Sequence, residues 1–305
     1  MMKKKEKNSF GGLALSDRIF YIFCNAFVAI CAVVALYPMI FMVASSLSSA
    51  NAISSGKVFL WPVEPTIEGF RLVFKTKEII TGYRNTIFYT AAATVLNVMF
   101  NMMVIYPLAR KNFYGRNLFM LFIYIPGVLS GGMIPAYILY TKLHMVNTIW
   151  MMIIPGLFST YFILVGKAML ADALPEEVLE AAKIDGCSDF RYFFEMVLPL
   201  SKALVAIIAF NSAMGHWNNY MTPMIYIHDE SKYPLQLVLR NILIKNTVNS
   251  NMLMDLTSED AMLKKNATEL LKYSSIVVSI LPLLCLLPFM QKYFIRGTLT
   301  GAVKG

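Results

Sequence analysis

The stretch EEVLEAAKIDGCSDFRYFFEMVLP, residues 176–199, carries the most distinctive arrangement of charged groups in the chain. Its eight charged residues are Glu176, Glu177, Glu180, Lys183, Asp185, Asp189, Arg191 and Glu195. Each of these side chains would cost roughly 2.5–3.5 kcal/mol at the centre of a bilayer. The stretch must therefore lie in water, although very apolar segments flank it, and its chemistry is that of a docking surface rather than a catalytic site.

The first half of this stretch has the start and stop signals of a short helix. Pro175 fits the first helical position, and Glu176 and Glu177 follow in the first turn, where the helix dipole favours anions by about 0.3–1 kcal/mol each. Gly186 accepts a left-handed cap, so the helix should end near Asp185. A helix of about 11 residues is roughly 16 Å long and cannot cross a membrane.

The side chains of this helix indicate a protein partner. The small pair Ala181 and Ala182 would let another backbone come close, and Glu180 can pair with Lys183 or with a cation of the partner. Ser188 can cap a second helix after the glycine turn. Helices that lie on anionic lipid are usually basic, whereas this one is acidic, so a protein partner fits better than the membrane surface.

Other polar residues lie inside apolar segments and form a candidate substrate path. Thr90, Thr94, Asn97 and Asn101 are spaced 4, 3 and 4 apart, which places them on one helical face. Such a stripe can form hydrogen bonds between helices, worth about 0.6 kcal/mol each, or can line a polar path for a substrate. We favour the interhelical hydrogen bonds.

Amide and aromatic side chains near Asn211 and His216 would suit a sugar, although Trp217 and Tyr220 also fit an interfacial aromatic belt. The candidate path set is Thr90, Thr94, Asn97, Asn101, Tyr137, Asn211, Trp217, Asn218 and Asn219.

No motif predicts an enzyme. The sequence lacks a G-x-x-x-x-G-K-[ST] loop for ATP phosphates and an H-E-x-x-H zinc motif, and it has only three histidines. Its four cysteines have neither a disulfide nor a metal-site spacing. Any energy source must then belong to a partner, and we expect no cofactor and no metal in this chain.

The composition predicts an all-α membrane protein. The 305 residues are 57% hydrophobic and 15% charged, against about 45–50% apolar residues in soluble domains. Windows of about 20 apolar residues can cross a bilayer as helices. Six such windows are predicted as transmembrane helices, at about 19–43, 86–109, 117–139, 148–171, 200–226 and 271–290. They form one transmembrane domain, 19–290, between an N-terminal segment, 1–18, and a C-terminal tail, 291–305.

The distribution of cations sets the expected orientation. Arg110, Lys111 and Arg116 crowd one short loop, whereas Lys142 is alone in the next, so the positive-inside rule places the first loop in the cytoplasm. Both termini and the loop 172–199 are then cytoplasmic. The net charge of +9 is explained by anionic lipid head groups at the membrane edges, and no nucleic-acid partner is expected.

Proline and glycine interrupt two of the predicted spans. Pro126-Gly127 lies in the third and Pro155-Gly156 in the fourth. Proline removes a backbone donor, so both spans should bend or partly unwind. Such breaks fit a moving transport path, and they are also common in ordinary transmembrane helices.

The spacing in the inner loop resembles a known family. It is similar to the EAA loop of ABC-importer permeases, E-A-A-x3-G-x9-I-x-L-P. The matching residues are Glu180-Ala181-Ala182, then Gly186 after three residues, Met196 after nine more and Leu198-Pro199 after one more. Met196 stands where the family has isoleucine. Three other segments resemble the carbohydrate-uptake class of these permeases, specifically its MalG-like subunit in the maltose transporter. They are Trp217-Asn218, Tyr233-Pro234-Leu235 and the C-terminal residues 295–305.

The resemblance implies a fold, partners and a localisation. The fold would be the type I importer permease fold (MetI-like), in a multi-pass protein of the bacterial cytoplasmic membrane. The partners would be a second permease subunit, two cytoplasmic ATPase subunits that use ATP and Mg, an extracellular solute-binding protein and a carbohydrate, in particular an oligosaccharide. In the maltose system the principal membrane sugar site lies in the other permease subunit.

The resemblance also assigns residues to roles. Coupling to the ATPase would use Glu176, Glu177, Glu180, Ala181, Ala182, Asp185, Gly186, Leu198 and Pro199. Coupling through the tail would use Gly297, Gly301, Val303, Lys304 and Gly305. Contact with the binding protein would use Tyr226, Tyr233, Pro234 and Leu235.

Two other functions remain open on the sequence. One is an importer permease for a non-sugar solute such as an amino acid or an anion. The other is an ion-coupled secondary transporter, against which few acidic residues lie deep in any span to bind a coupling ion.

Overall fold

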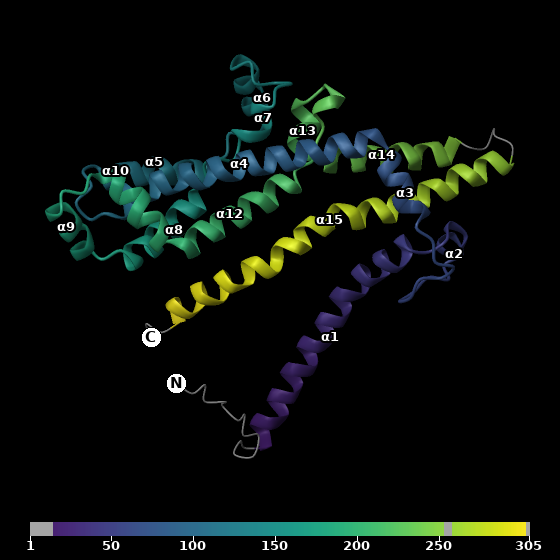
Figure 1. The fold of residues 1–305 in the computed structure, drawn as a ribbon, viewed down its shortest axis with the longest axis horizontal. Coiled ribbons are helices and arrows are strands. Elements are labelled where there is room, and N and C mark those ends of the chain that lie inside the picture. Colours follow the sequence, from purple (N-terminus) through teal and green to yellow (C-terminus); the bar gives the residue numbers. More distant parts are fainter. Residues whose placement is uncertain (1–14, 253–257, 303–305) are drawn as a thin grey trace. The chain divides into compact units, whose positions relative to one another are not determined.

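The computed structural model describes the backbone over residues 15–252 and 258–302, and side chains over 16–244 and 266–288. Figure 1 shows that the described part of the chain is built from helices. It divides into two compact units. The first holds α1, α2, most of α3 and α15 up to Val277, and the second holds α4 to α14 and α15 from Val278.

The first unit is organised around a long apolar helix. Helix α1, Leu15–Ser46, is followed by α2, Ala50–Ser54, and α3, Glu68–Lys75. The hydroxyl of Ser274 on α15, Ser258–Ala302, donates to the carbonyl of Ser46 at 3.4 Å. The ring of Phe41 meets that of Tyr273 edge-on at 5.9 Å. Between Ser16 and Ser46 the exposed surface of α1 is overwhelmingly apolar, as expected of a helix surrounded by lipid or by partner helices.

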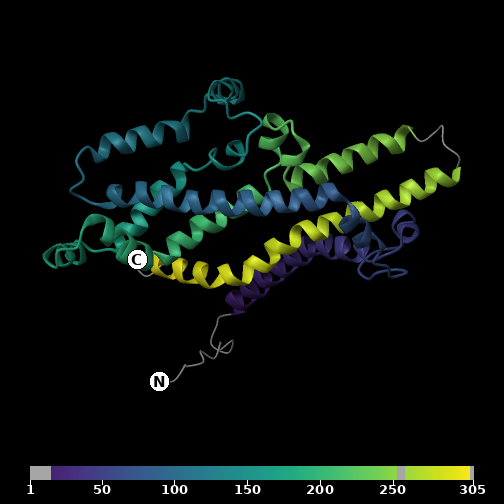
Figure 2. The same cartoon turned by 45° about the horizontal axis from the view of Figure 1, so that its top comes forward.

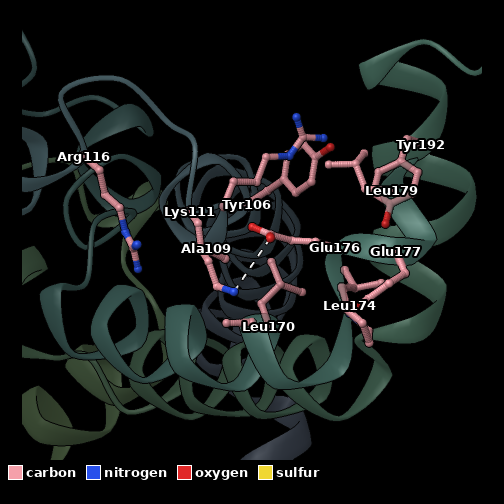
Figure 3. Close-up of a pocket in the computed structure, with 13 residues that line it drawn as sticks. Tyr106, Ala109, Lys111, Arg116, Leu170, Leu174, Glu176, Glu177, Leu179 and Tyr192 are labelled. Carbon is pink, nitrogen blue, oxygen red and sulfur yellow. Dashed lines mark ion pairs between the residues drawn. The ribbon is translucent and has the colours of Figure 1, made fainter. Parts of the chain in front are cut away.

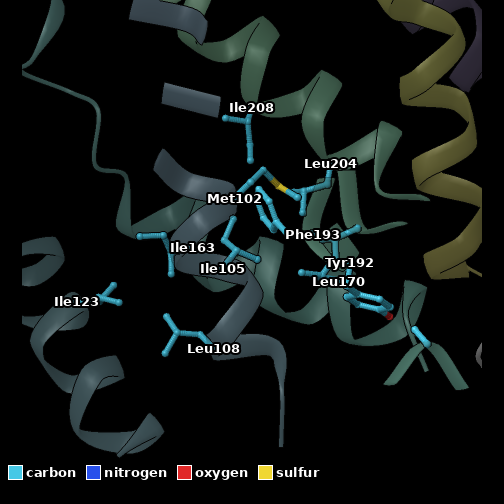
Figure 4. Close-up of a cluster of buried hydrophobic side chains, with 12 residues drawn as sticks. Met102, Ile105, Leu108, Ile123, Ile163, Leu170, Tyr192, Phe193, Leu204 and Ile208 are labelled. Atoms are coloured by element: carbon cyan, nitrogen blue, oxygen red, sulfur yellow. The ribbon is translucent and has the colours of Figure 1, made fainter. Parts of the chain in front are cut away.

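The second unit is built on α4, Lys77–Ala109, which packs against α8, Thr160–Ala173, and α12, Lys202–Trp217. Figure 4 shows the apolar cluster at this junction, where Met102 and Ile105 of α4 lie among side chains of α8, of α12 and of the segment that joins α8 to α12. A Cβ on Gly166 of α8 would approach Ile105 Cδ1 to 2.6 Å. The absence of a side chain there lets α8 pack closely on α4.

The third predicted span is two helices. Helices α5, Arg116–Val128, and α6, Met133–Lys142, meet at an angle of 116°. The turn follows Pro126 and runs through Gly132, whose φ is +85°. In Figure 2 α6 points almost toward the viewer, while α5 lies across the view. The bend predicted for the third span is therefore confirmed.

The fourth and fifth predicted spans are also interrupted. The fourth consists of α7, Trp150–Ile153, a break at Pro155 and Gly156, and then α8. The fifth is α12 alone, because the helix ends at Trp217 and α13, Met221–Tyr226, is separate. The break predicted in the fourth span is therefore confirmed, whereas the helix expected over 200–226 ends nine residues earlier than predicted.

By length and composition, three described helices could each cross a membrane: Ser16–Ser46, Lys77–Ala109 and Asn266–Pro288. Two bent pairs could raise the number to five, namely α5 with α6, and residues 189–200 with α12, which meet at 80°. The second and sixth predicted spans lie within longer helices, α4 and α15. Two further elements follow α13, namely a 3₁₀ turn, Glu230–Lys232, and α14, Leu235–Met252. We refer to residues 227–252 as the outer segment, because the predicted topology places them outside the cytoplasm.

Candidate functional site

The helix predicted in the charged stretch is confirmed as α9, Glu176–Ile184. Pro175 is its N-cap and Asp185 its C-cap. Gly186 follows with φ of +73°, a conformation that costs an L-residue about 1–2 kcal/mol. Its N–H donates to the carbonyl of Lys183 at 3.0 Å, which closes the helix as expected of a glycine cap.

The chain turns at Gly186 and enters a second, irregular helix. Ser188 caps α10, Asp189–Tyr192, by accepting a hydrogen bond from the N–H of Arg191, as predicted. A π-helix, Phe193–Val197, and a short helix α11, Leu198–Leu200, then lead into α12. We refer to residues 175–200 as the coupling loop, after the role that the sequence resemblance predicts for them. Its second half buries Tyr192, Phe193 and Val197 in the apolar cluster of α4, α8 and α12.

The outer surface of the coupling loop contains two residues that the sequence analysis did not single out. Ile184 is 86% exposed and Phe190 is 76% exposed, and they lie on either side of the turn at Gly186. Exposed apolar side chains on a charged loop are available for contact with a partner. Glu180 and Ala181 are exposed as well, whereas Ala182 is buried inside this chain. Of the two alanines, only Ala181 is therefore available to a partner in this structure.

Arg110, at the end of α4, ties the coupling loop to the helix bundle. Its Nη2 lies 3.0 Å from Oδ1 of Asp189, and its guanidinium lies 4.2 Å from the centre of the Tyr106 ring. The same guanidinium is 6.0 Å from the Tyr192 ring, where burial raises the pKa of the Tyr192 hydroxyl. The sequence analysis counted Arg110 only as an orientation signal, because its partners are far away along the chain.

A second ion pair lies beside the first. Lys111 Nζ is 3.7 Å from Oε2 of Glu176. Figure 3 shows this pair among the residues that line a pocket of about 530 Å³. Both side chains are substantially exposed, so the pair contributes at most about 1 kcal/mol. The two ion pairs together hold α9 and α10 against the loop that follows α4.

The polar stripe of α4 faces the break between α7 and α8. Asn97 Nδ2 donates to the carbonyl of Gly156 at 2.7 Å, and Asn101 Nδ2 donates to the carbonyl of Leu157 at 2.8 Å. Both asparagines are buried, and they satisfy carbonyls that the broken helix leaves free. These bonds are the interhelical hydrogen bonds that the sequence analysis favoured for the stripe. Thr90 and Thr94 also turn their hydroxyls inward.

The other candidate path residues separate into two groups. Asn211 and Asn219 line a cavity together with Asn97, whereas Trp217, Asn218 and Tyr137 do not. Trp217 is buried and its indole N–H donates to the carbonyl of Ser279 at 3.0 Å. Asn218 bonds the carbonyl of Met214, and Tyr137 stacks on Tyr226 at 5.5 Å. The structure thus gathers only part of the set around one space.

The residues expected to touch a binding protein lie mostly inside the chain. Tyr226, Pro234 and Leu235 are buried, and Leu235 N–H donates to the hydroxyl of Thr86 at 2.8 Å. Tyr233 is the more accessible member of the set. In this conformation the buried three support the outer segment rather than form its surface.

A hydrogen-bonded corner lies beside these residues in the outer segment. Asn147 Oδ1 accepts the N–H groups of His228 and Asp229. Hydrogen bonds from Ser231 lower the pKa of Asp229. This corner holds the chain after α13 against the loop that follows α6.

The expected tail residues are only partly described. Gly297 and Gly301 lie in the last turns of α15, while Val303, Lys304 and Gly305 lie outside the described residues.

The helix bundle and the coupling loop were compared with those of known proteins. Residues 12–300 match the family described as binding-protein-dependent transport system inner membrane component. The chain belongs to this family. It is therefore a multi-pass protein of the cytoplasmic membrane, with the all-helical fold of an ABC-importer permease.

Individual members of the family cover almost the whole chain. The protein LplC of Bacillus subtilis (strain 168) is 33% identical over 95% of this chain and 96% of its own length. The polygalacturonan/rhamnogalacturonan transport system permease protein YtcP of the same strain is 32% identical over 95% of this chain and all of its own length. A chain in the crystal structure of a bacterial ABC transporter that imports the acidic polysaccharide alginate superposes with a TM-score of 0.83. It is 30% identical, over 92% of this chain and 99% of that chain.

Proposed function

We propose that this chain is a permease subunit of an ATP-driven ABC importer that moves a carbohydrate, in particular an oligosaccharide, by alternating access. Its similarity over nearly the whole chain to YtcP and to the alginate importer supports a saccharide as the substrate. The observation that carries the importer mechanism is the coupling loop, in which α9 and α10 expose Ile184 and Phe190 on either side of the turn at Gly186.

The coupling loop would dock on a cytoplasmic ATPase subunit through its exposed residues. Ile184 and Phe190 would be covered there, with Glu180 and Ala181 beside them. Movement of α9 would pass to the end of α4 through the pair of Lys111 and Glu176. Movement of α10 would pass to α4 through Arg110 and to α12 through the π-helix. Gly186 would set the angle between the docking helix and the rest of the loop.

The chain would cross the membrane six times with both termini in the cytoplasm. The fourth crossing would be the interrupted pair of α7 and α8, and the sixth would lie within α15. Gly297 to Gly305 would extend from the sixth crossing toward the ATPase subunits.

The complete importer would need partners that supply energy and substrate. These are a second permease subunit, two ATPase subunits that bind ATP and Mg, and an extracellular solute-binding protein that contacts the outer segment near Tyr233. This chain would have no catalytic site of its own.

Reconstitution of the complete importer in proteoliposomes tests this function. Uptake of four labelled probes, namely raffinose, arabinotriose, galactotriose and trigalacturonate, would be measured with ATP inside and the binding protein outside. We expect ATP-dependent uptake of at least one probe and its loss in Gly186→Pro, which breaks the turn of the coupling loop. Uptake by this chain alone, driven by an ion gradient, would contradict the proposal.

A further inference from the structure

An open cavity of about 460 Å³ lies at the surface of the second unit, where α4, α12 and the break between α7 and α8 meet. Its volume is within the range of about 300–1,000 Å³ that small-molecule sites occupy. The lining residues come from four segments: Asn97 of α4; Pro155, Gly156, Phe158, Ser159 and Phe162 at the break and the start of α8; Asn211, Ser212, Gly215 and His216 of α12; and Asn219 and Thr222 beyond it.

The break between α7 and α8 brings aromatic side chains to this cavity. The helix resumes only at Thr160, with Ser159 as its N-cap, so Phe158 lies on non-helical backbone and remains 39% exposed. Phe162, in the first turn of α8, lines the same cavity. Aromatic faces are large apolar surfaces with a defined orientation, and they suit the C–H faces of a sugar ring.

The α12 side of the cavity presents polar atoms that the described chain leaves without partners. Ser212 Oγ and His216 Nδ1 are buried and make no hydrogen bond with any described residue. Asn211 donates through its Nδ2 to the carbonyl of Ile207 at 3.0 Å, which leaves its Oδ1 to accept from another group. A buried polar atom without a partner costs about 1–3 kcal/mol. The cavity therefore favours an occupant with hydroxyl groups over a lipid chain.

The lining is uncharged. None of the twelve described lining residues is an aspartate, glutamate, lysine or arginine. A carboxylate taken out of water without a cation to pair with is strongly disfavoured. The hydroxyls of a neutral sugar, by contrast, can donate to Asn211 Oδ1 and accept from the hydroxyl of Ser212.

We infer that this cavity binds one uncharged glycosyl unit of the transported saccharide, with Phe158 and Phe162 against the ring and Asn211 and Ser212 at its hydroxyls. The inference rests on the proposed function and gives this subunit a saccharide site of its own. A uronate unit is excluded from the cavity by its charge.

The test compares cavity variants with matched controls in the reconstituted importer, using the same four probes. Phe158→Ala removes a cavity ring, and Phe122→Ala removes an exposed ring of α5 that does not line the cavity. Asn211→Ala and Asn25→Ala each remove an exposed asparagine whose amide donates to the carbonyl four residues earlier, but only Asn211 lines the cavity. Asn211→Ala should fold normally because the side chain is exposed.

Uptake of the neutral probe that the importer carries should fall about threefold to tenfold in Phe158→Ala, because a stacking contact is lost. It should fall about fivefold in Asn211→Ala, because a hydrogen bond is lost. ATP hydrolysis stimulated by the binding protein should remain, and both controls should match the wild type.

Three results would overturn the cavity inference. They are unchanged uptake in both cavity variants, an equal fall in both controls, and uptake of trigalacturonate as the only probe carried. Each of these leaves the importer function standing. Failure of the wild type to carry any probe would instead count against the proposed function.

Discussion

Arg110 makes the contacts that join α4 to the coupling loop, and its planar guanidinium is suited to all of them. It stacks on Tyr106 and pairs with Asp189 at the same time. Arg110→Ala should lower stability by about 0.5–2 kcal/mol through loss of the ring contact, and should lower uptake for each ATP hydrolysed. The measurement is uptake and ATP hydrolysis in the same proteoliposomes.

Two further variants separate this positioning role from simple loss of charge. Arg110→Lys keeps the charge but loses the planar group, so it should restore only part of the coupling. Arg191→Ala removes an exposed pair with Glu195 inside the coupling loop, worth about 0–1 kcal/mol, and should behave as wild type. Full coupling in Arg110→Ala would show that the Arg110 contacts are not used for coupling.

Asn101 supports the broken backbone opposite α4. It is fully buried and donates to the carbonyl of Leu157, so Asn101→Ala leaves that carbonyl without its partner and opens a small space. The expected cost is about 1–3 kcal/mol. A lower thermal unfolding temperature of the purified importer in detergent should report this loss. Asn25→Ala, which removes an exposed asparagine on α1, should leave the unfolding temperature unchanged.

At the scale of elements, the turn at Gly186 sets the direction of α9. Gly186→Ala places a side chain at φ of +73°, at a cost of about 1–2 kcal/mol that the loop can relieve by changing this turn. We expect normal assembly but reduced stimulation of ATP hydrolysis, measured on the complete importer. Gly131→Ala is the matched control, because a Cβ there meets no atom within 4 Å and φ is not positive. Equal activity of the two variants would contradict a role for the turn.

The elements that could be predicted from the sequence are those whose signals are local. Pro175, Gly186 and Ser188 fixed the bounds of α9 and the start of α10, because caps act within a few residues. The breaks at Pro126 and Pro155 followed from proline geometry.

The elements and contacts that escaped prediction depend on residues that are far apart in the chain. The end of α12 at Trp217 accompanies a bond to Ser279, 62 residues away, and Arg110 meets Asp189 across 79 residues. Hydropathy windows register neither contact, so they extended the fifth span to 226. The cavity lining was predicted only in part. Asn211 and Asn219 were predicted as candidate path residues, but Phe158 was not, because its exposure depends on the break before α8.

At the scale of the whole molecule, the central question is whether the interrupted pair α7 and α8 crosses the membrane. The 14 residues of α8 span about 21 Å, less than the roughly 30 Å of a hydrocarbon core. Residues 150–159 must supply the remainder as α7 and irregular backbone. Irregular backbone at membrane depth is tolerated where protein satisfies its polar groups, as Asn97 and Asn101 do for the carbonyls of Gly156 and Leu157.

Cysteine labelling in cells tests this crossing directly. In a cysteine-free background without the ATPase subunits, Lys142→Cys and Lys183→Cys place one exposed thiol before α7 and one after α8. A membrane-impermeant maleimide should label position 142 in intact cells and position 183 only after permeabilisation, because the crossing puts them on opposite sides. Ser54→Cys, in the exposed segment after α1, should label like position 142. Labelling of 142 and 183 from the same side would mean that α7 and α8 form a re-entrant loop, and the number of crossings would fall to five.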